Sequence, residues 1–532
     1  FNVLESNDYE IELGCVKSGS SGDYDVYIDG KKISTVNFHG SGSVYVPMKE
    51  VSLDAGDHEI RFVCKGKSEQ SSGYGLTLSD LVLYDPDAQH MKDIADLGDT
   101  QKALWMYYGV SNGHGHSDTL NLGINAYGLD LTPELGYPEY ADSNPHRLEW
   151  VDNTISHNTV MVDRSGQDIL NKVEMPLHFD ESNYVRLTDV DAPLAYQSKN
   201  VDYRRTAAMI KINDTDFYTV DFFRVQGGSE HLYSFHGAEG TVTTEGLDLT
   251  PQTDSKGEYV GTYAGADTEF GIRPKEDTAN SGFHWLTKVR RDTNPSEKFS
   301  VDWHVKDTWN ALGRGKSSAT DVHIRLTMLN QTDDVAITTG TPPRNKAGNP
   351  KELEYLMAVR SGNNLDSLFT SVIEPYKGER VIEDISKVLL TADGKTYEGN
   401  DAACVKVSFK DGRTDYVIYS VNDDLVLTVN KKFTFKGFFG VYSERDDIPF
   451  YTYVNDGVFE SEDESVEARY TGKVTDFTKE ISLKNQITVK FDREPEISNI
   501  VGRYIYIKNN DVRNAVYRIL GARKQNDQIL LA

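Results

Sequence analysis

The sequence contains few cysteines and no long apolar segment. Its 532 residues include only three cysteines, Cys15, Cys64 and Cys404, and none of them forms a C-x-x-C pair. This pattern argues against a cysteine-based metal site. Cys15 and Cys64 lie in strand-like runs, and the sequence is compatible both with a disulfide between them and with two reduced thiols. No stretch reaches the roughly 20 apolar residues that a membrane-spanning helix needs.

Basic residues are also scarce, because 56 Lys and Arg stand against 83 Asp and Glu, giving a formal net charge of −27. Such a charge argues against nucleic acid and anionic membrane surfaces as partners. An anionic polysaccharide would need a local cluster of basic side chains. The candidates are Arg147, Arg204, Arg205 and Arg224, each of which is equally compatible with a surface or interface ion pair.

Long stretches with helical periodicity are missing as well, and strand-like runs separated by short polar turns fill most of the chain. In residues 1–85, short strand-like runs and polar turns predict a jelly-roll-like accessory β module. Residues 86–102 indicate a linker with a short helix, residues 103–445 a large β-sandwich domain, and residues 446–532 a small C-terminal β module. The predicted fold class is therefore mainly β, with a multi-layered antiparallel sandwich flanked by two smaller modules.

The two ends of the chain shape one further expectation. The chain begins at Phe1, without a methionine or a signal peptide, and ends in an apolar run at 528–532 that resembles an unfinished strand. We therefore expect it to be part of a longer polypeptide whose C-terminal module is cut short.

Residues 112–160 include the histidines His114, His116 and His157 together with several carboxylates. On a strand, His114 and His116 would point to the same face. Two histidines and a carboxylate are a common set of zinc ligands. The spacing does not select the carboxylate from Asp118, Asp130, Glu134 and Glu139, and surface histidines at the edge of a sandwich would give the same pattern.

The same stretch resembles the heparinase II/III-like family of polysaccharide lyases, which also includes alginate and oligoalginate lyases. The resemblance covers roughly residues 103–444. It is carried by the runs Gly113-His114-Gly115-His116-Ser117-Asp118, Ala126-Tyr127-Gly128, Pro133-Glu134-Leu135-Gly136-Tyr137 and Ser156-His157-Asn158-Thr159-Val160.

This resemblance implies that His114 faces the substrate as a catalytic residue, and that His116, Glu134 and His157 hold a structural zinc ion. Glu134 stands where the family usually has aspartate, with Asp130 as the reserve ligand. The implied activity is β-elimination on a uronic-acid polysaccharide such as heparan sulfate or alginate, by a secreted, cell-surface or periplasmic protein. In the family a helical (α/α) toroid supplies a catalytic tyrosine, and because this chain lacks that pattern we expect it to be inactive or weakly active alone.

The substrate-binding candidates are Asn112, Arg147, Arg204 and His236, although a histidine such as His236 is more often a turn or core residue. Two other functions remain open. One is a metal-dependent glycan hydrolase with an open coordination position. The other is a non-catalytic carbohydrate-binding or scaffold protein built from sandwiches.

Overall fold

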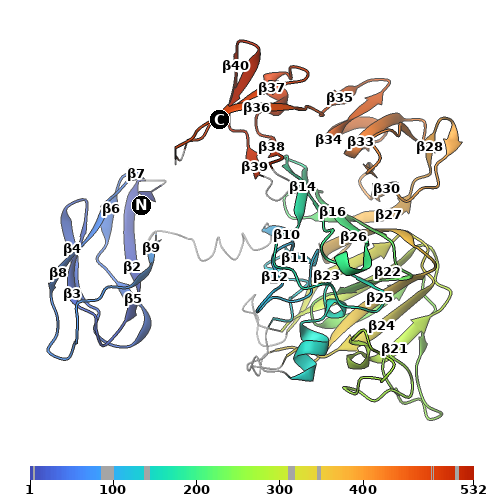
Figure 1. Ribbon diagram of the computed structural model, residues 1–532, viewed down its shortest axis with the longest axis horizontal. Coiled ribbons are helices and arrows are strands. Elements are labelled where there is room, and N and C mark those ends of the chain that lie inside the picture. Colours follow the sequence, from blue (N-terminus) through green and yellow to red (C-terminus); the bar gives the residue numbers. More distant parts are fainter. Residues whose placement is uncertain are drawn as a thin grey trace. The chain divides into compact units, whose positions relative to one another are not determined.

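The computed structural model (Figure 1) describes residues 1–3, 6–84, 101–136, 144–308, 318–343, 349–480, 482, 484–509 and 515–532. The chain divides into two compact units, Phe1–Leu97 and Gly98–Ala532. The linker helix expected within 86–102 falls almost wholly outside the described residues. Lys102, the last residue of the expected linker, already belongs to strand β10.

The first unit consists of short antiparallel strands around a small apolar core. Its three sheets contain β1 (Asn2–Val3) and β7 (Gly56–Asp57); β2 (Asn7–Lys17), β5 (Gly42–Pro47), β6 (Val51–Leu53) and β9 (Leu78–Tyr84); and β3 (Asp23–Ile28), β4 (Lys31–Asn37) and β8 (Ile60–Gly66). Cys15 is buried in this core, whereas Cys64 is exposed, and both thiols are free. The two cysteines therefore do not pair in this structure.

The second unit is built around three stacked sheets. The six-stranded sheet has the order β13 (Val160–Val162), β18 (Glu230–His236), β25 (Leu353–Ser361), β24 (Asp334–Gly340), β21 (Thr287–Asp292) and β20 (Thr250–Pro251). The eight-stranded sheet has the order β14 (Met175–Glu181), β15 (Val185–Asp191), β16 (Asp202–Lys211), β17 (Phe217–Gln226), β26 (Asp366–Lys377), β23 (Ser318–Met328), β22 (Phe299–Asp307) and β19 (Gly240–Glu245).

The third sheet has nine strands. Its main path is β27 (Ile382–Lys387), β30 (Ala402–Phe409), β31 (Arg413–Ser420), β33 (Phe433–Arg445), β32 (Leu427–Val429), β28 (Leu390–Ala392) and β29 (Lys395–Thr396), with β34 (Ile448–Ser461) on β33 and β35 (Ser465–Glu467) on β34. The strand pairings within these sheets are antiparallel. The structure thus confirms the expected multi-layered antiparallel sandwich.

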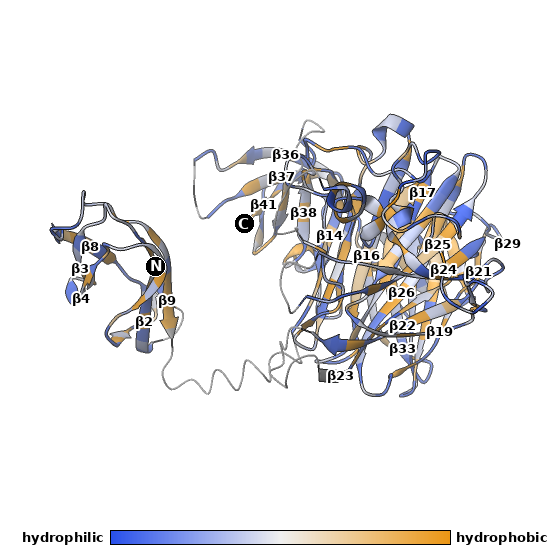
Figure 2. Ribbon diagram, turned by 90° about the horizontal axis from the view of Figure 1, so that it is seen from below, coloured by the Kyte–Doolittle hydropathy of each residue, from blue (hydrophilic) through white to orange (hydrophobic). Residues whose placement is uncertain are grey.

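Strand β17 shows why the eight-stranded sheet is the middle layer. Side chains alternate between the two faces of a strand, and β17 is apolar on both. Phe223 and Val225 enter the core shared with the six-stranded sheet, whereas Val220 and Phe222 enter the core shared with the nine-stranded sheet. A strand covered on both faces gives the near-continuous apolar run seen here, and Figure 2 shows the hydrophobic colouring gathered on such strands.

The expected boundary between the large domain and the C-terminal module, at 445/446, falls inside the long β33–β34 hairpin. The nine-stranded sheet therefore continues to Glu467, because β34 and β35 complete it. A smaller module follows, with a four-stranded sheet of β36 (Gly472–Phe477), β37 (Ile487–Phe491), β41 (Gln528–Leu531) and β40 (Ala522–Gln525), and a pair of β38 (Tyr504–Ile507) and β39 (Ala515–Arg518).

Helices in the described part of the chain are short. They are η1 (Arg147–Val151), η2 (Thr154–Ser156), η3 (Gln197–Lys199), η4 (Phe283–Trp285) and α2 (Ile497–Ile500). In these described ranges no helix has the length and apolar character needed to cross a membrane.

Candidate metal centre and catalytic histidine

A small sheet of β10 (Lys102–Met106), β11 (Leu122–Ala126) and β12 (Leu129–Asp130) presents the histidine-rich loop. His114 and His116 lie between β10 and β11, and Glu134 follows β12. Trp105 of β10 stands directly opposite Gly123 of β11. A Cβ at position 123 would lie 1.9 Å from the indole, so only glycine allows Trp105 to cover this sheet.

The loop is fixed to the segment that carries His157. The backbone N–H of Ser117 donates to the Asp152 carbonyl (2.9 Å), and the Thr154 hydroxyl donates back to the Ser117 carbonyl (2.8 Å). Further along, the Leu122 N–H donates to the Asn158 carbonyl (3.3 Å). Residues 117–122 and 152–158 therefore run side by side, which brings together histidines that are 41 positions apart in sequence.

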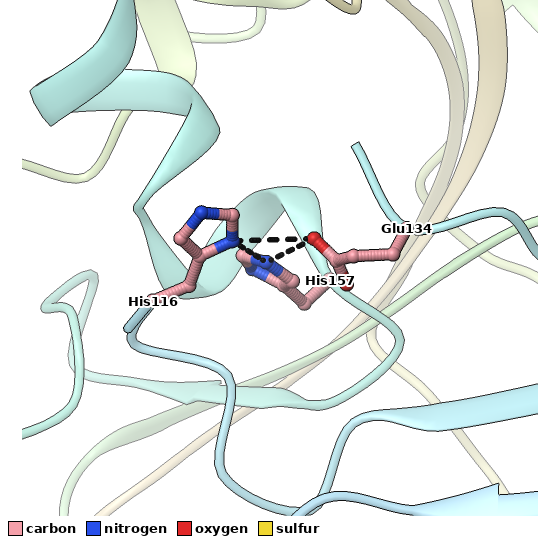
Figure 3. A group of neighbouring side chains, drawn as sticks. All are labelled: His116, Glu134 and His157. Atoms are coloured by element: carbon pink, nitrogen blue, oxygen red, sulfur yellow. Dashed lines mark hydrogen bonds and ion pairs between the residues drawn. The ribbon is translucent and has the colours of Figure 1, made fainter. Parts of the chain in front are cut away.

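The side chains of His116, Glu134 and His157 converge on one point, as Figure 3 shows. His116 Nδ1 lies 3.1 Å from His157 Nε2 and 3.2 Å from Glu134 Oε1, and His157 Nε2 lies 3.0 Å from Glu134 Oε1. Zinc bonds of about 2.0–2.1 Å in a tetrahedron place neighbouring ligand atoms about 3.3 Å apart. The three separations are close to this value, so the cluster has the size that a zinc ion requires.

Groups behind the cluster orient it. His157 Nδ1 lies 2.8 Å from the Asn153 carbonyl, which fixes Nδ1 as the donor and leaves the Nε2 lone pair facing the cluster. Asn121 donates its amide N–H to Glu134 Oε2 (2.9 Å). Asp152 Oδ1 lies 3.4 Å from His116 Nε2. Hydrogen bonds such as those made by His157 Nδ1 and Glu134 Oε2 fix the orientation of ligand side chains in metal sites.

The cluster requires a positive charge, because a lone pair on His157 and the carboxylate of Glu134 face each other. Burial opposes protonation of His157, but Glu134 raises the pKa of this histidine to about 9. Burial favours a neutral Glu134, but His157 and His116 hold the pKa of this carboxyl well below its usual range. The positive charge is therefore either a proton or a metal ion, and a metal ion would displace the proton on binding.

Asp118 is a further carboxylate beside the cluster. Sequence spacing alone left it open as a metal ligand, together with Asp130, Glu134 and Glu139. Its side chain is buried, and burial raises its pKa to about 6. Its Oδ1 has no hydrogen-bond partner within the part of the chain that the structure describes. Asp130, the reserve ligand, is exposed and lies outside the cluster, and Glu139 lies outside the described residues.

His114 differs from His116 in being exposed. Gly115 between them approaches the backbone of Ser111 so closely that a Cβ would lie 2.7 Å from the Ser111 Cα. Asn112 is exposed on the same loop and donates its side-chain amide to Asn171 Oδ1 (2.6 Å). The loop therefore points one imidazole inward to the cluster and leaves the other at the surface.

The remaining substrate-binding candidates occupy three different surroundings. Arg147 lies behind the cluster, with Nε 3.3 Å from Asp152 Oδ2. His236 is buried against Tyr355 (ring centroids 4.7 Å apart), and burial lowers its pKa to about 4, so its ring is neutral. Arg204 pairs with the buried Asp189 through two hydrogen bonds of 2.9 and 2.7 Å.

Arg204 and Arg205 point to opposite faces of β16 because they are consecutive strand residues. Arg204 lies over the ring of Phe438 on β33, whereas Arg205 points toward the histidine segments. Arg205 is fully buried and makes two 2.8 Å bonds to Asp221. Its Nη1 donates to the carbonyls of Leu120 (2.7 Å) and Asn158 (2.5 Å). Arg205 is therefore an internal clamp that joins the segment of His116 to the segment of His157.

Comparison with known proteins gives a family match for this region. Residues 99–337 match the family model described as "Heparinase II/III-like, C-terminal". The match confirms the resemblance and contains every residue of the cluster. A search of curated proteins found no match.

Among solved structures, heparan sulfate lyase HepC from Pedobacter heparinus is 14% identical, with a TM-score of 0.37, over 62% of this chain and 39% of that one. Another, titled heparinase III, is 14% identical, with a TM-score of 0.36, over 61% of this chain and 40% of that one. The chain thus spans about two fifths of the length of the solved structures it matches.

Proposed function

We propose that this protein is part of a polysaccharide lyase that cleaves a uronic-acid-containing polysaccharide, such as heparan sulfate or alginate, by β-elimination. The observation that carries the proposal is the single loop that places His116 in a zinc-sized cluster with Glu134 and His157 and leaves His114 exposed beside it. This loop lies within the region that matches the heparinase II/III-like family.

In the proposed reaction a base removes the C5 proton of the uronic acid, and O4 of the departing sugar is protonated as the C4–O4 bond breaks. His114 is the histidine of this proton transfer, because an imidazole can accept or donate a proton near neutral pH. Asn112, exposed on the same loop, supplies a hydrogen bond to the sugar. The second proton-transfer group is a tyrosine supplied by a part of the polypeptide outside this chain.

The proposed metal ion has a structural role. Bound by His116, Glu134 and His157, it would supply a divalent positive charge that holds the three side chains together. It would thereby fix the loop that carries His114. Within this proposal Arg147 and His236 support the cluster from behind. We do not assign Arg204 to the sugar, because it faces away from the cluster and is paired with Asp189.

Degradation assays on heparan sulfate, hyaluronan and alginate test the proposal, using the 532-residue chain and a longer form of the polypeptide. We expect an ultraviolet-absorbing unsaturated product from the longer form and its loss in His114→Ala. The control is His58→Asn, which removes a histidine of the first unit. An unsaturated product that persists in His114→Ala would overturn the catalytic assignment.

The same assays separate the two alternatives. Release of saturated sugars alone would identify a hydrolase. Retention of polysaccharide without turnover, unchanged in His114→Ala, would identify a carbohydrate-binding protein.

A further inference from the structure

Two segments lie side by side immediately before the exposed His114. The backbone N–H groups of Ser111 and Asn112 both donate to the Leu170 carbonyl (3.1 Å each), and the Leu170 N–H donates to the Ser111 hydroxyl (2.7 Å). Ser111 and Leu170 are buried, so the exposed side chains come from their neighbours. We call the exposed side chains of residues 108–112 and 169–173 the flanking surface.

The flanking surface exposes a group of apolar side chains. Tyr108, Val110, Ile169 and Val173 are 36%, 40%, 70% and 54% exposed. Exposed apolar residues that gather on adjoining segments mark sites for ligands or partners. Tyrosine combines an apolar ring with a polar tip, and such a ring suits a ligand that is apolar on one face and wet on its edges. A sugar ring has this character.

The flanking surface also lacks carboxylates. Neither of its segments contains Asp or Glu, and the whole run 101–117 contains none, in a chain that has 83 of them. Lys172 is exposed on this surface and forms no ion pair with any residue that the structure describes. In a protein with a formal net charge of −27, this local positive charge favours an anionic ligand.

The amides of Asn112 and Asn171 are held in one orientation. Asn112 Oδ1 accepts from the Gly113 N–H (2.8 Å), so the Nδ2 of Asn112 faces Asn171 and donates to Asn171 Oδ1 (2.6 Å). The Nδ2 of Asn171 must then point away from this pair. Each amide nitrogen carries two N–H donors, so Asn171 presents two donors to a ligand and Asn112 keeps one.

The flanking surface is close to His114 along the chain. His114 follows Asn112 by two residues, which limits the distance between their Cα atoms to about 7.6 Å. Both residues are exposed. This separation lies within the span of a short oligosaccharide, so one polysaccharide chain can reach both.

We infer that the flanking surface binds one sugar unit of an acidic polysaccharide, beside the unit that meets His114. Asn171 donates to an oxygen of this sugar, Lys172 pairs with its carboxylate or sulfate group, and Tyr108 covers its ring. Asn112 is a positioning residue that fixes the amide of Asn171. The place of this sugar beside His114 rests on the proposed function, whereas its chemical class follows from the flanking surface itself.

Asn171→Asp is the variant that tests the inference. It keeps an oxygen that accepts from Asn112, but it removes both donors and adds a negative charge. We expect the affinity for an acidic polysaccharide to fall about 10–100-fold. Asn499→Asp is the matched control, because it adds the same charge at an exposed position of α2, and it should leave the affinity unchanged.

Calorimetry with oligosaccharides of heparan sulfate, hyaluronan and alginate measures this affinity, for the 532-residue chain and for a longer form of the polypeptide. At least one of the three is expected to bind. Lys172→Gln should weaken the same binding and reduce its dependence on salt. Unchanged affinity in both Asn171→Asp and Lys172→Gln, or no binding of any of the three by either form, would overturn the inference.

The lyase assay separates this inference from the proposed function. Weaker binding in Asn171→Asp, without an unsaturated product from either form, would support the sugar site and refute the lyase. An unsaturated product formed with an unchanged KM in Asn171→Asp would support the lyase and overturn the sugar site. A lower melting temperature of Asn171→Asp in the longer form alone, with unchanged affinity, would show that polypeptide covers this surface and would also overturn the sugar site.

Discussion

Replacement of Arg205 by methionine should destabilise the large domain far more than the loss of one surface charge. Arg205 and Asp221 are both fully buried, and the guanidinium also donates to the carbonyls of Leu120 and Asn158. Methionine fills much of the same volume but donates no hydrogen bond. Asp221 would then remain buried as a carboxylate whose remaining side-chain donor is the Tyr233 hydroxyl, at 2.9 Å.

The expected loss in the free energy of unfolding is about 3–5 kcal/mol, the range typical of removing one partner from a buried ion pair. The Leu120 carbonyl also loses its Arg205 donor, and the Asn158 carbonyl keeps the weaker bond from the Leu122 N–H, so we expect a value toward the upper end of that range. Adding Asp221→Leu to the same protein should recover part of the loss, because the unpaired charge is then removed as well.

Urea unfolding monitored by tryptophan fluorescence measures this loss. Trp150 and Trp303 are fully buried in cores of the second unit and report on its unfolding. The control is Arg164→Met, because Arg164 pairs with Glu230 at the surface with 64% of its side chain exposed, and such pairs contribute less than about 1 kcal/mol. If Arg205→Met costs no more than Arg164→Met, the clamp assigned to Arg205 is wrong.

Three other measurements address the same region. Zn²⁺ at about 100 times its dissociation constant should add about 2.7 kcal/mol of stability by binding to His116, Glu134 and His157, and thermal melts should show this increment in the wild type but not in Glu134→Gln. Gly115→Ala should weaken Zn²⁺ binding at that cluster, because its Cβ would collide with the Ser111 backbone; unchanged affinity by calorimetry would contradict this. Burial raises the pKa of Glu174 to about 7 from 4.5, so its folded form is penalised as pH rises through that interval. Glu174→Gln should therefore match the wild type in stability at pH 4 and exceed it at pH 8 by about 1–3 kcal/mol. Equal melting temperatures of variant and wild type at both pH values would refute the shift.

The cluster of His116, Glu134 and His157 shows how much of the candidate site can be predicted from local sequence. The three ligand candidates were identified through the family resemblance, and the structure brings those three side chains together. Spacing alone left four carboxylates open, because a loop residue's direction depends on the contacts that hold the loop. Those contacts are non-local hydrogen bonds, such as that from Ser117 to Asp152, which no periodicity in the sequence records.

The basic residues show what local sequence could not predict, which is the direction in which each side chain points. Arg204 and Arg205 are equivalent in charge and adjacent in sequence, yet one faces the nine-stranded sheet and the other clamps the histidine segments. The register of β16 decides which of the two arginines faces the nine-stranded sheet and which faces the histidine segments. The boundary expected at 445/446 falls inside the β33–β34 hairpin for a related reason, because the local sequence does not record which strands pair across that point.

The sequence by itself determined the mainly β class and the match of residues 99–337 to the heparinase II/III-like model, and it indicated His114, His116 and His157 as site candidates. Alternation of apolar residues and short motifs are local properties, so the sequence alone reveals them. The tertiary structure alone decided the three-layer stacking and the clamp at Arg205. These depend on which strands pair and in which register, and pairing is set by burial summed over segments far apart in the chain.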